Sequence, residues 1–159
     1  MEADDKSRIL IVDDQSANIK ILSNLLGDDY AISVATSGPE AMIVARKVIP
    51  DLILLDVIMP EVAGITVCQE MKEDPDLAEI PIIFVTSLDT EANEAAGFAV
   101  GASDYITKPI NPDIVKARVK VHLQNRQYAQ FLQLLLSQKI DQLDQVKVEA
   151  AKLKAGFLL

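Results

Sequence analysis

Short runs of apolar residues alternate with helical patterns along most of this 159-residue chain. Apolar runs of four or five residues without polar alternation are typical of strands that are covered on both faces. Strands that alternate with helices predict a parallel sheet with right-handed crossovers. The five expected strands occupy residues 8–12, 31–35, 51–55, 81–85 and 104–106. The sequence therefore predicts an α/β fold of the flavodoxin-like type, a doubly wound five-stranded parallel sheet.

Helices are expected between and after these strands, at about 16–26, 38–48, 64–72 and 91–100, with a last helix after Pro112. This last helix is predicted to be extended and continuous, because no proline follows Asp113 and the only later glycine is Gly156. Apolar residues recur along it at intervals of three or four, which is typical of a helical stripe. The stripe contains Leu132, Leu136, Ile140, Leu143, Val146, Ala150, Leu153 and Phe157.

Three parts are expected in the chain: an N-terminal tail at 1–7, one domain at 8–125 and the extended C-terminal helix at 126–159. We interpret the helix as a coiled-coil signalling helix. It would either pair two subunits into a homodimer or lead to an output domain. The alternative is a helix that folds back on its own domain.

The balance of charges and cysteines narrows the function. The chain has 24 acidic and 15 basic residues and a formal net charge of −9, which would repel a phosphate backbone, so direct nucleic-acid binding is not expected. Cys68 is the only cysteine, which excludes an intramolecular disulfide and suits a reducing compartment. With no leader-like N-terminus and no run of 18 apolar residues, we expect a soluble, cytoplasmic protein without a membrane partner.

Polar side chains follow the ends of the predicted strands. In a doubly wound sheet, ligands bind beyond the carboxyl ends of the strands, where the strand order reverses. Carboxylates, hydroxyls and one lysine are therefore expected to converge on one edge of the sheet. The residues at these strand ends are Asp13-Asp14, Thr36-Ser37, Asp56, Thr86-Ser87 and Thr107-Lys108.

Three carboxylates brought together repel one another unless a cation or a lysine neutralises them. Mg²⁺ suits such a site, since it accepts one or two carboxylates, keeps several waters and adds a phosphate oxygen. A carboxylate of this cluster could itself attack phosphorus and form an acyl phosphate, with Lys108 and the Thr86 hydroxyl holding the other phosphoryl oxygens. Taken singly, Asp13-Asp14 and Thr86 could be helix caps, and Lys108 a solvated loop lysine.

Four sequence blocks together resemble the signature of response-regulator receiver domains. They are Ile-Leu-Ile-Val-Asp13-Asp14, Leu-Leu-Asp56-Val-Ile-Met59-Pro60 with Gly64 beyond, Val85-Thr86-Ser87, and Asp104-Tyr105-Ile-Thr-Lys108-Pro109. The similarity extends from about Arg8 to Asn125. It implies that Asp56 is the phosphoacceptor and takes its phosphoryl group from a sensor histidine kinase or a phosphotransfer protein.

The same resemblance implies a set of metal ligands around Asp56. Asp14 and Asp56 would bind Mg²⁺ directly and Asp13 mainly through water. The backbone carbonyl of Ile58 would complete the protein ligands.

Other residues are implied to bind the phosphoryl group and to transmit its presence. Lys108 would pair with it, while Thr86 and Tyr105 would couple phosphorylation to the surface of the fourth helix, fifth strand and fifth helix. Ser87 departs from the family, which usually has Ala or Gly there, and this puts turnover in question.

The lifetime of the phosphoryl group is expected to be long. In this family the path of the hydrolytic water would be flanked by Ile58 and Leu88, and neither apolar side chain can orient a water. Ser87 narrows the same approach.

We interpret the chain as a phosphorylation-controlled switch with at most slow autodephosphorylation, rather than as an enzyme. One alternative is a Mg²⁺-dependent phosphohydrolase with an aspartyl nucleophile. Such enzymes usually carry a second Asp two residues after the nucleophile, where this chain has Ile58. Another alternative is a degenerate receiver that serves only as an interaction module, against which the intact acidic and lysine set argues. His122, the only histidine, is expected on the surface of the long helix.

Overall fold

The computed structural model describes residues 5–87 and 91–157. Five parallel strands form one sheet in the order β2-β1-β3-β4-β5. The strands are β1 (Arg8–Val12), β2 (Ala31–Ala35), β3 (Leu52–Leu55), β4 (Ile82–Thr86) and β5 (Asp104–Thr107). This topology confirms the predicted doubly wound α/β fold, and its strand order reverses between β1 and β3.

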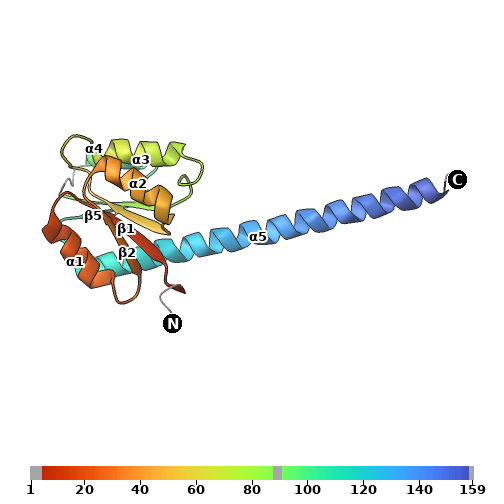
Figure 1. Cartoon of the computed structure of the whole chain (residues 1–159), viewed down its shortest axis with the longest axis horizontal. Helices are drawn as coiled ribbons and strands as arrows, with labels where there is room; N and C mark the ends of the chain where they lie inside the picture. The colour runs from red at the N-terminus through yellow and green to blue at the C-terminus, as the bar shows by residue number, and fades with distance from the viewer. Residues whose placement is uncertain (1–4, 88–90, 158–159) are drawn as a thin grey trace. The chain divides into compact units, whose positions relative to one another are not determined.

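Helices connect successive strands and lie on both sides of the sheet (Figure 1). They are α1 (Ser16–Leu26), α2 (Gly38–Val48), α3 (Gly64–Glu73), α4 (Glu91–Ala99) and α5 (Pro112–Phe157). α2, α3 and α4 cover one face, and α1 and the first turns of α5 cover the other.

Both faces of the central strands are buried, which explains their unbroken apolar runs. In β1, Leu10 and Val12 belong to the core under α2 and α3, whereas Ile9 and Ile11 belong to the core under α1 and α5. In a strand that is buried on both faces, polar side chains are expected only at the ends of the strand. The buried polar side chains Asp13, Asp56 and Thr86 accordingly lie at the carboxyl ends of β1, β3 and β4.

Local hydrogen bonds define where several elements begin and end. β4 and β5 extend to Thr86 and Thr107, one residue beyond the predicted ends, because these two residues are partners in the parallel ladder. At the start of α2, the Ser37 hydroxyl accepts a hydrogen bond from the Glu40 N–H at 3.3 Å. The Glu40 carboxylate in turn accepts hydrogen bonds from the Thr36 N–H at 3.0 Å and the Thr36 hydroxyl at 2.9 Å, one residue before the N-cap donor that a capping box would use.

The chain divides into two compact units, Met1–Gln124 and Asn125–Leu159. In the second unit, every residue from Gln127 to Phe157 is exposed. Among the described residues, no helix combines the length and the apolarity needed to cross a membrane.

Candidate functional site

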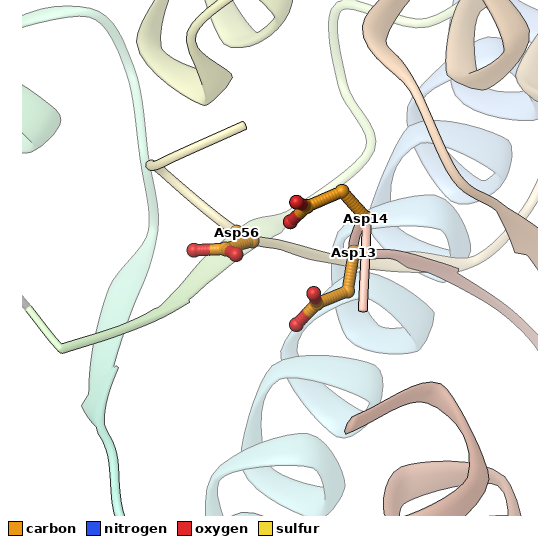
Figure 2. A group of neighbouring side chains, drawn as sticks. All are labelled: Asp13, Asp14 and Asp56. Atoms are coloured by element: carbon orange, nitrogen blue, oxygen red, sulfur yellow. The ribbon is translucent and has the colours of Figure 1, made fainter. Parts of the chain in front are cut away.

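Three carboxyl groups converge where β1 and β3 end side by side (Figure 2). Val12 and Leu55 are partners in the ladder, so the residues that follow them, Asp13 and Asp56, emerge at the same edge of the sheet. Asp13, Asp14 and Asp56 each place a carboxylate oxygen within 4.8 Å of the others. The parallel register thus brings together groups that lie more than forty residues apart in the sequence.

Lys108 is the cation of this cluster. Its Nζ lies 3.1 Å from Oδ2 of Asp13 and 3.4 Å from Oδ2 of Asp56, and both carboxylates are buried. Burial raises the pKa of Asp56 above its ordinary value, the Lys108 charge opposes that rise and the Asp13 charge adds to it. Three carboxylates facing one ammonium group leave negative charge in excess.

Backbone groups hold the two buried carboxylates in place. The Gln15 N–H donates to Oδ1 of Asp13 at 2.9 Å, and the Ile58 N–H donates to Oδ1 of Asp56 at 3.2 Å. The backbone of Lys108 is also held in place, because its backbone N–H donates a hydrogen bond to the carbonyl of Thr86 at 2.9 Å. Backbone hydrogen bonds therefore fix the positions of the residues that follow β1, β3 and β5 in this cluster.

Gly64 allows the loop after Asp56 to turn back closely. Its N–H donates to the Val57 carbonyl at 2.8 Å, and a Cβ at this position would lie 2.0 Å from the carbonyl oxygen of Asp56. Only glycine fits such an approach. The first residue of α3 is thus packed against the backbone of the acidic cluster.

The cluster opens into a cavity of about 590 Å³. Ile58 and Ser87, two of the predicted site residues, are among the residues that line it. The sequence did not single out Gln15 and Asn18, although Gln15 directly follows the aspartate pair and Asn18 lies in the first turn of the helix after it. The lining residues are Asp14, Gln15, Asn18, Asp56, Ile58, Met59, Pro60, Ser87 and Lys108.

Two of the predicted switch residues lie deeper. Thr86 ends β4 and is fully buried. The Tyr105 ring in β5 packs edge-to-face on Phe84, with ring centroids 6.0 Å apart, and is also buried. Leu88, predicted to flank the path of the hydrolytic water, lies outside the described residues.

A second polar cluster, which sequence reasoning missed, ties β5 to α5. The Asp104 carboxylate bonds Arg118 and His122, each at 2.8 Å, and Arg118 also donates to the Tyr105 carbonyl. Burial raises the pKa of Asp104, but hydrogen bonds from His122 and the Tyr105 N–H and the Arg118 charge lower it overall. His122 lies on the long helix as expected, but half-buried and bonded rather than free on the surface.

The acidic cluster fits a hard divalent cation. Its three carboxylate oxygens are spaced closely enough to share one ion, and their negative charge exceeds what Lys108 neutralises. Asp14 is the least buried of the three, so an ion there could keep several waters, as Mg²⁺ prefers. Receiver domains in general bind Mg²⁺ at such an acidic pocket.

The fold and the acidic site define a signalling domain of the receiver type. The family model described as the response regulator receiver domain matches residues 9–120, and the chain belongs to this family. Receiver domains are phosphorylated by histidine kinases and are mostly not enzymes.

Similar proteins agree with this assignment. The chain is 44% identical over 115 residues to "Response regulator PleD" of Caulobacter vibrioides, covering 72% of this chain and 25% of that protein. It is 38% identical over 123 residues to the alkaline phosphatase synthesis transcriptional regulatory protein PhoP of Bacillus subtilis, covering 77% of this chain and 50% of that protein. The chain therefore spans a quarter to a half of these relatives.

Solved structures show the same architecture. A response regulator from Chloroflexus aurantiacus aligns with a TM-score of 0.72 at 34% identity, covering 75% of this chain and 98% of that one. The BeF3-activated receiver domain of RstA from Klebsiella pneumoniae aligns with a TM-score of 0.67 at 32% identity, covering 74% and 98%. Both alignments cover almost the whole of the compared chain.

Proposed function

We propose that this receiver accepts a phosphoryl group on Asp56 in a Mg²⁺-dependent reaction and changes conformation to control a partner or an output domain. The observation that carries the proposal is the bridge formed by Lys108 between Asp13 and Asp56 at the edge where β1 and β3 end. It joins a buried nucleophile, a second carboxylate and a cation at the mouth of an open cavity.

In the proposed reaction, a carboxylate oxygen of Asp56 attacks the phosphorus of a phosphohistidine. The N–P bond breaks as the O–P bond forms, which leaves an acyl phosphate on Asp56 and returns the electron pair to the imidazole of the donor. The donor would be a sensor histidine kinase or a phosphotransfer protein. The Ile58 N–H, bonded to Oδ1, fixes the orientation of the attacking carboxylate.

Asp14 and Asp56 would hold Mg²⁺ directly, with Asp13 acting mainly through water and Ile58 through its backbone carbonyl. When bound, the ion would neutralise the charge that gathers on the transferring phosphoryl oxygens. Because the oxygens of Asp13, Asp14 and Asp56 already lie within 4.8 Å of one another, these carboxylates need no large rearrangement to surround one ion.

Lys108 would then exchange partners. Its ammonium group, now shared between Asp13 and Asp56, would pair with the new phosphoryl group while staying close to Asp13. The Thr86 hydroxyl would bind another phosphoryl oxygen, and the resulting shift would be transmitted to Tyr105 and the surface formed by α4, β5 and α5. Thr86 and Lys108 are already linked by a backbone hydrogen bond of 2.9 Å, which supports a coupled movement.

The phosphoryl group is proposed to be long-lived. Ile58 and Ser87 line the cavity above Asp56, so an apolar side chain and a narrowing hydroxyl face the approach of water. Leu88 is assigned to the same path on family resemblance alone. No group at these positions would act as a base toward the water.

The C-terminal helix is proposed to pair two copies of the chain, and the chain itself is not proposed to bind nucleic acid, given its net charge of −9. Truncation after about Asn125 should yield a monomer that still accepts phosphate. Equilibrium sedimentation of both forms at micromolar concentration would test this, and a monomeric full-length chain would contradict it.

The acceptor assignment is tested by intact-mass measurement after incubation with Mg²⁺ and acetyl phosphate. The wild-type chain should gain one phosphoryl group, and Asp56→Asn should gain none. Asp14→Ala should lose most of the dependence on Mg²⁺, because it removes a ligand and keeps the acceptor. Equal labelling of Asp56→Asn would refute the assignment.

The same measurement separates the alternatives. Rapid, repeated release of inorganic phosphate by the wild-type chain would indicate a phosphohydrolase. A chain that gains no phosphoryl group from acetyl phosphate or from any kinase donor would be an interaction module only.

A further inference from the structure

The exposed part of α5 carries a heptad repeat. Starting at Ala129, the residues at every seventh position alternate with a second set three residues later, which is the spacing of a and d positions in a coiled coil. The a positions are Ala129, Leu136, Leu143, Ala150 and Phe157, and the d positions are Leu132, Lys139, Val146 and Leu153. Eight of these nine residues are apolar, and the pattern continues for four heptads.

These side chains face water in the single chain. Leu136 and Leu153 are 63% and 66% exposed, and all described residues beyond Arg126 are exposed. A helix in water draws most of its stability from packing an apolar face, so this face needs a cover. Phe131, Leu134 and Val148 lie off the a and d positions, and pairing through the heptads leaves them uncovered.

We infer that the cover is a second copy of this chain, aligned parallel and in register along 129–157. This inference rests on the proposed pairing of the C-terminal helix and adds its direction and register. Charge complementarity supports it, since in a parallel pair each g residue faces the e residue five positions later in the partner. Glu149 at g then faces Lys154 at e in the second copy, and the symmetry of the pair forms this contact twice.

The other flanking positions agree with the parallel arrangement. Leu135 at g faces Ile140 at e, which widens the apolar seam, and Gln142 at g faces Lys147 at e without repulsion. An antiparallel pair with the a and d layers matched would place Glu149 opposite Leu135 and would leave the lysines without an acidic partner. The flanking residues therefore select the parallel pair.

Lys139 is the one polar residue in the seam. In a parallel pair the two copies of Lys139 share a layer, which weakens the seam there. Its long apolar stem can still line the seam while the ammonium group reaches water. Ile140, directly after it, adds apolar cover to the same layer.

Cysteine cross-linking distinguishes the possible arrangements. Ala150→Cys places a thiol at an a position, and Ala151→Cys, its matched control, places the same thiol at the outward b position. Ala129→Cys tests the other end of the seam. The native Cys68 is buried, and burial raises the pKa of its thiol to about 11, so it should stay silent under mild oxidation.

A parallel, in-register pair predicts disulfide-linked dimers from Ala129→Cys and from Ala150→Cys, and at least tenfold less from Ala151→Cys. In an antiparallel pair, neither Ala129→Cys nor Ala150→Cys would form a disulfide with the same position of the second copy. A chain carrying both Ala150→Cys and Leu132→Cys would instead form a disulfide between position 150 of one copy and position 132 of the other. A helix folded back on its own domain would give monomers throughout. Either of these last two results would overturn the parallel assignment.

Charge exchange gives a second, independent readout. Glu149→Lys should weaken dimerisation about tenfold in sedimentation equilibrium at low salt, and adding Lys154→Glu should restore it. Equal affinities of all three chains would overturn the assignment of this pair. Because both experiments use unphosphorylated protein, Asp56→Asn should give the same cross-linking pattern, so failure of the acceptor assignment would leave this test intact.

Discussion

Asp56→Asn is expected to stabilise the metal-free receiver while abolishing its acceptor function. The substitution keeps the shape of the side chain and an oxygen for the Ile58 N–H, and it removes one negative charge from a buried cluster. Because the pKa of Asp56 is raised in the folded chain, the ionised carboxylate disfavours folding at neutral pH. Removing that charge should therefore increase the free energy of unfolding.

The size of the effect follows from three contributions. At an effective dielectric constant of about 20, oxygens within 4.8 Å of each other repel by at least about 3.5 kcal/mol. Lys108 Nζ at 3.4 Å from Asp56 attracts by about 5 kcal/mol on the same scale. Asp13 and Asp14 both repel Asp56 on this scale, so their summed repulsion exceeds the attraction of Lys108, and the burial cost of a few kcal/mol adds to it. We expect a gain of about 1–3 kcal/mol, in the range of substitutions that act on a buried charge.

Urea unfolding in EDTA at pH 7.5, followed by circular dichroism, measures this gain. Asp28→Asn is the matched control, because it removes an exposed carboxylate and so reports the effect of net charge alone. The stability difference between Asp56→Asn and wild type should shrink as the pH falls through the folded pKa of Asp56 toward the ordinary value of 3.8. Added Mg²⁺ should also reduce the difference, since it binds the wild-type site better. An Asp56→Asn chain less stable than wild type in EDTA at pH 7.5 would refute the reasoning.

Three further variants test other parts of the domain. Ile58→Asn combined with Leu88→Glu should speed loss of the phosphoryl group about tenfold, which corresponds to a barrier lower by about 1.4 kcal/mol. Intact mass over time measures this loss. A wild-type half-life of seconds that is unchanged in the double variant would contradict the prediction. Gly64→Ala should lower the free energy of unfolding by about 2 kcal/mol or more and slow labelling by acetyl phosphate, because its Cβ would lie 2.0 Å from the Asp56 carbonyl oxygen. Burial raises the pKa of Asp104, but its hydrogen bonds and neighbouring cations lower the pKa overall. The ionised carboxylate of Asp104 therefore stabilises the fold at pH values above its ordinary pKa of 3.8. This stabilisation is lost as the pH falls through the pKa of Asp104 in the folded chain. Asp104→Asn should thus lose about 1 kcal/mol at pH 7 and progressively less as the pH falls below 3.8 in urea titrations, and a loss that stays constant over this range would argue against an electrostatic role.

The acidic cluster could be located from the sequence because backbone topology alone brings it together. Once 8–12 and 51–55 are identified as parallel strands, their carboxyl ends must share an edge of the sheet. Asp13 and Asp56 follow those ends, so no knowledge of side-chain packing was needed to bring them close. The same reasoning placed Lys108, which follows β5 on the same edge.

The features that depend on side-chain packing could not be predicted from the sequence. The bond between Asp104 and His122 depends on how α5 docks against β5, because the residues are 18 positions apart and no repeat relates a strand end to a helix face. Because nothing in the sequence relates His122 to Asp104, His122 was predicted to be a surface residue. The close approach of Gly64 to the Asp56 carbonyl likewise depends on the path of a loop, which apolar periodicity does not describe.

The groups fixed by topology, Asp56 and Lys108, lie at one edge of the sheet, whereas the polar cluster fixed by packing joins β5 to α5. Tyr105 connects them, because it follows Asp104 directly, lies three residues before Lys108 and gives its carbonyl to Arg118. A movement of Lys108 toward a phosphoryl group would pull on the strand whose other hydrogen bonds hold the start of α5. The contact from Asp104 to α5 would then set how far that movement travels into the helix.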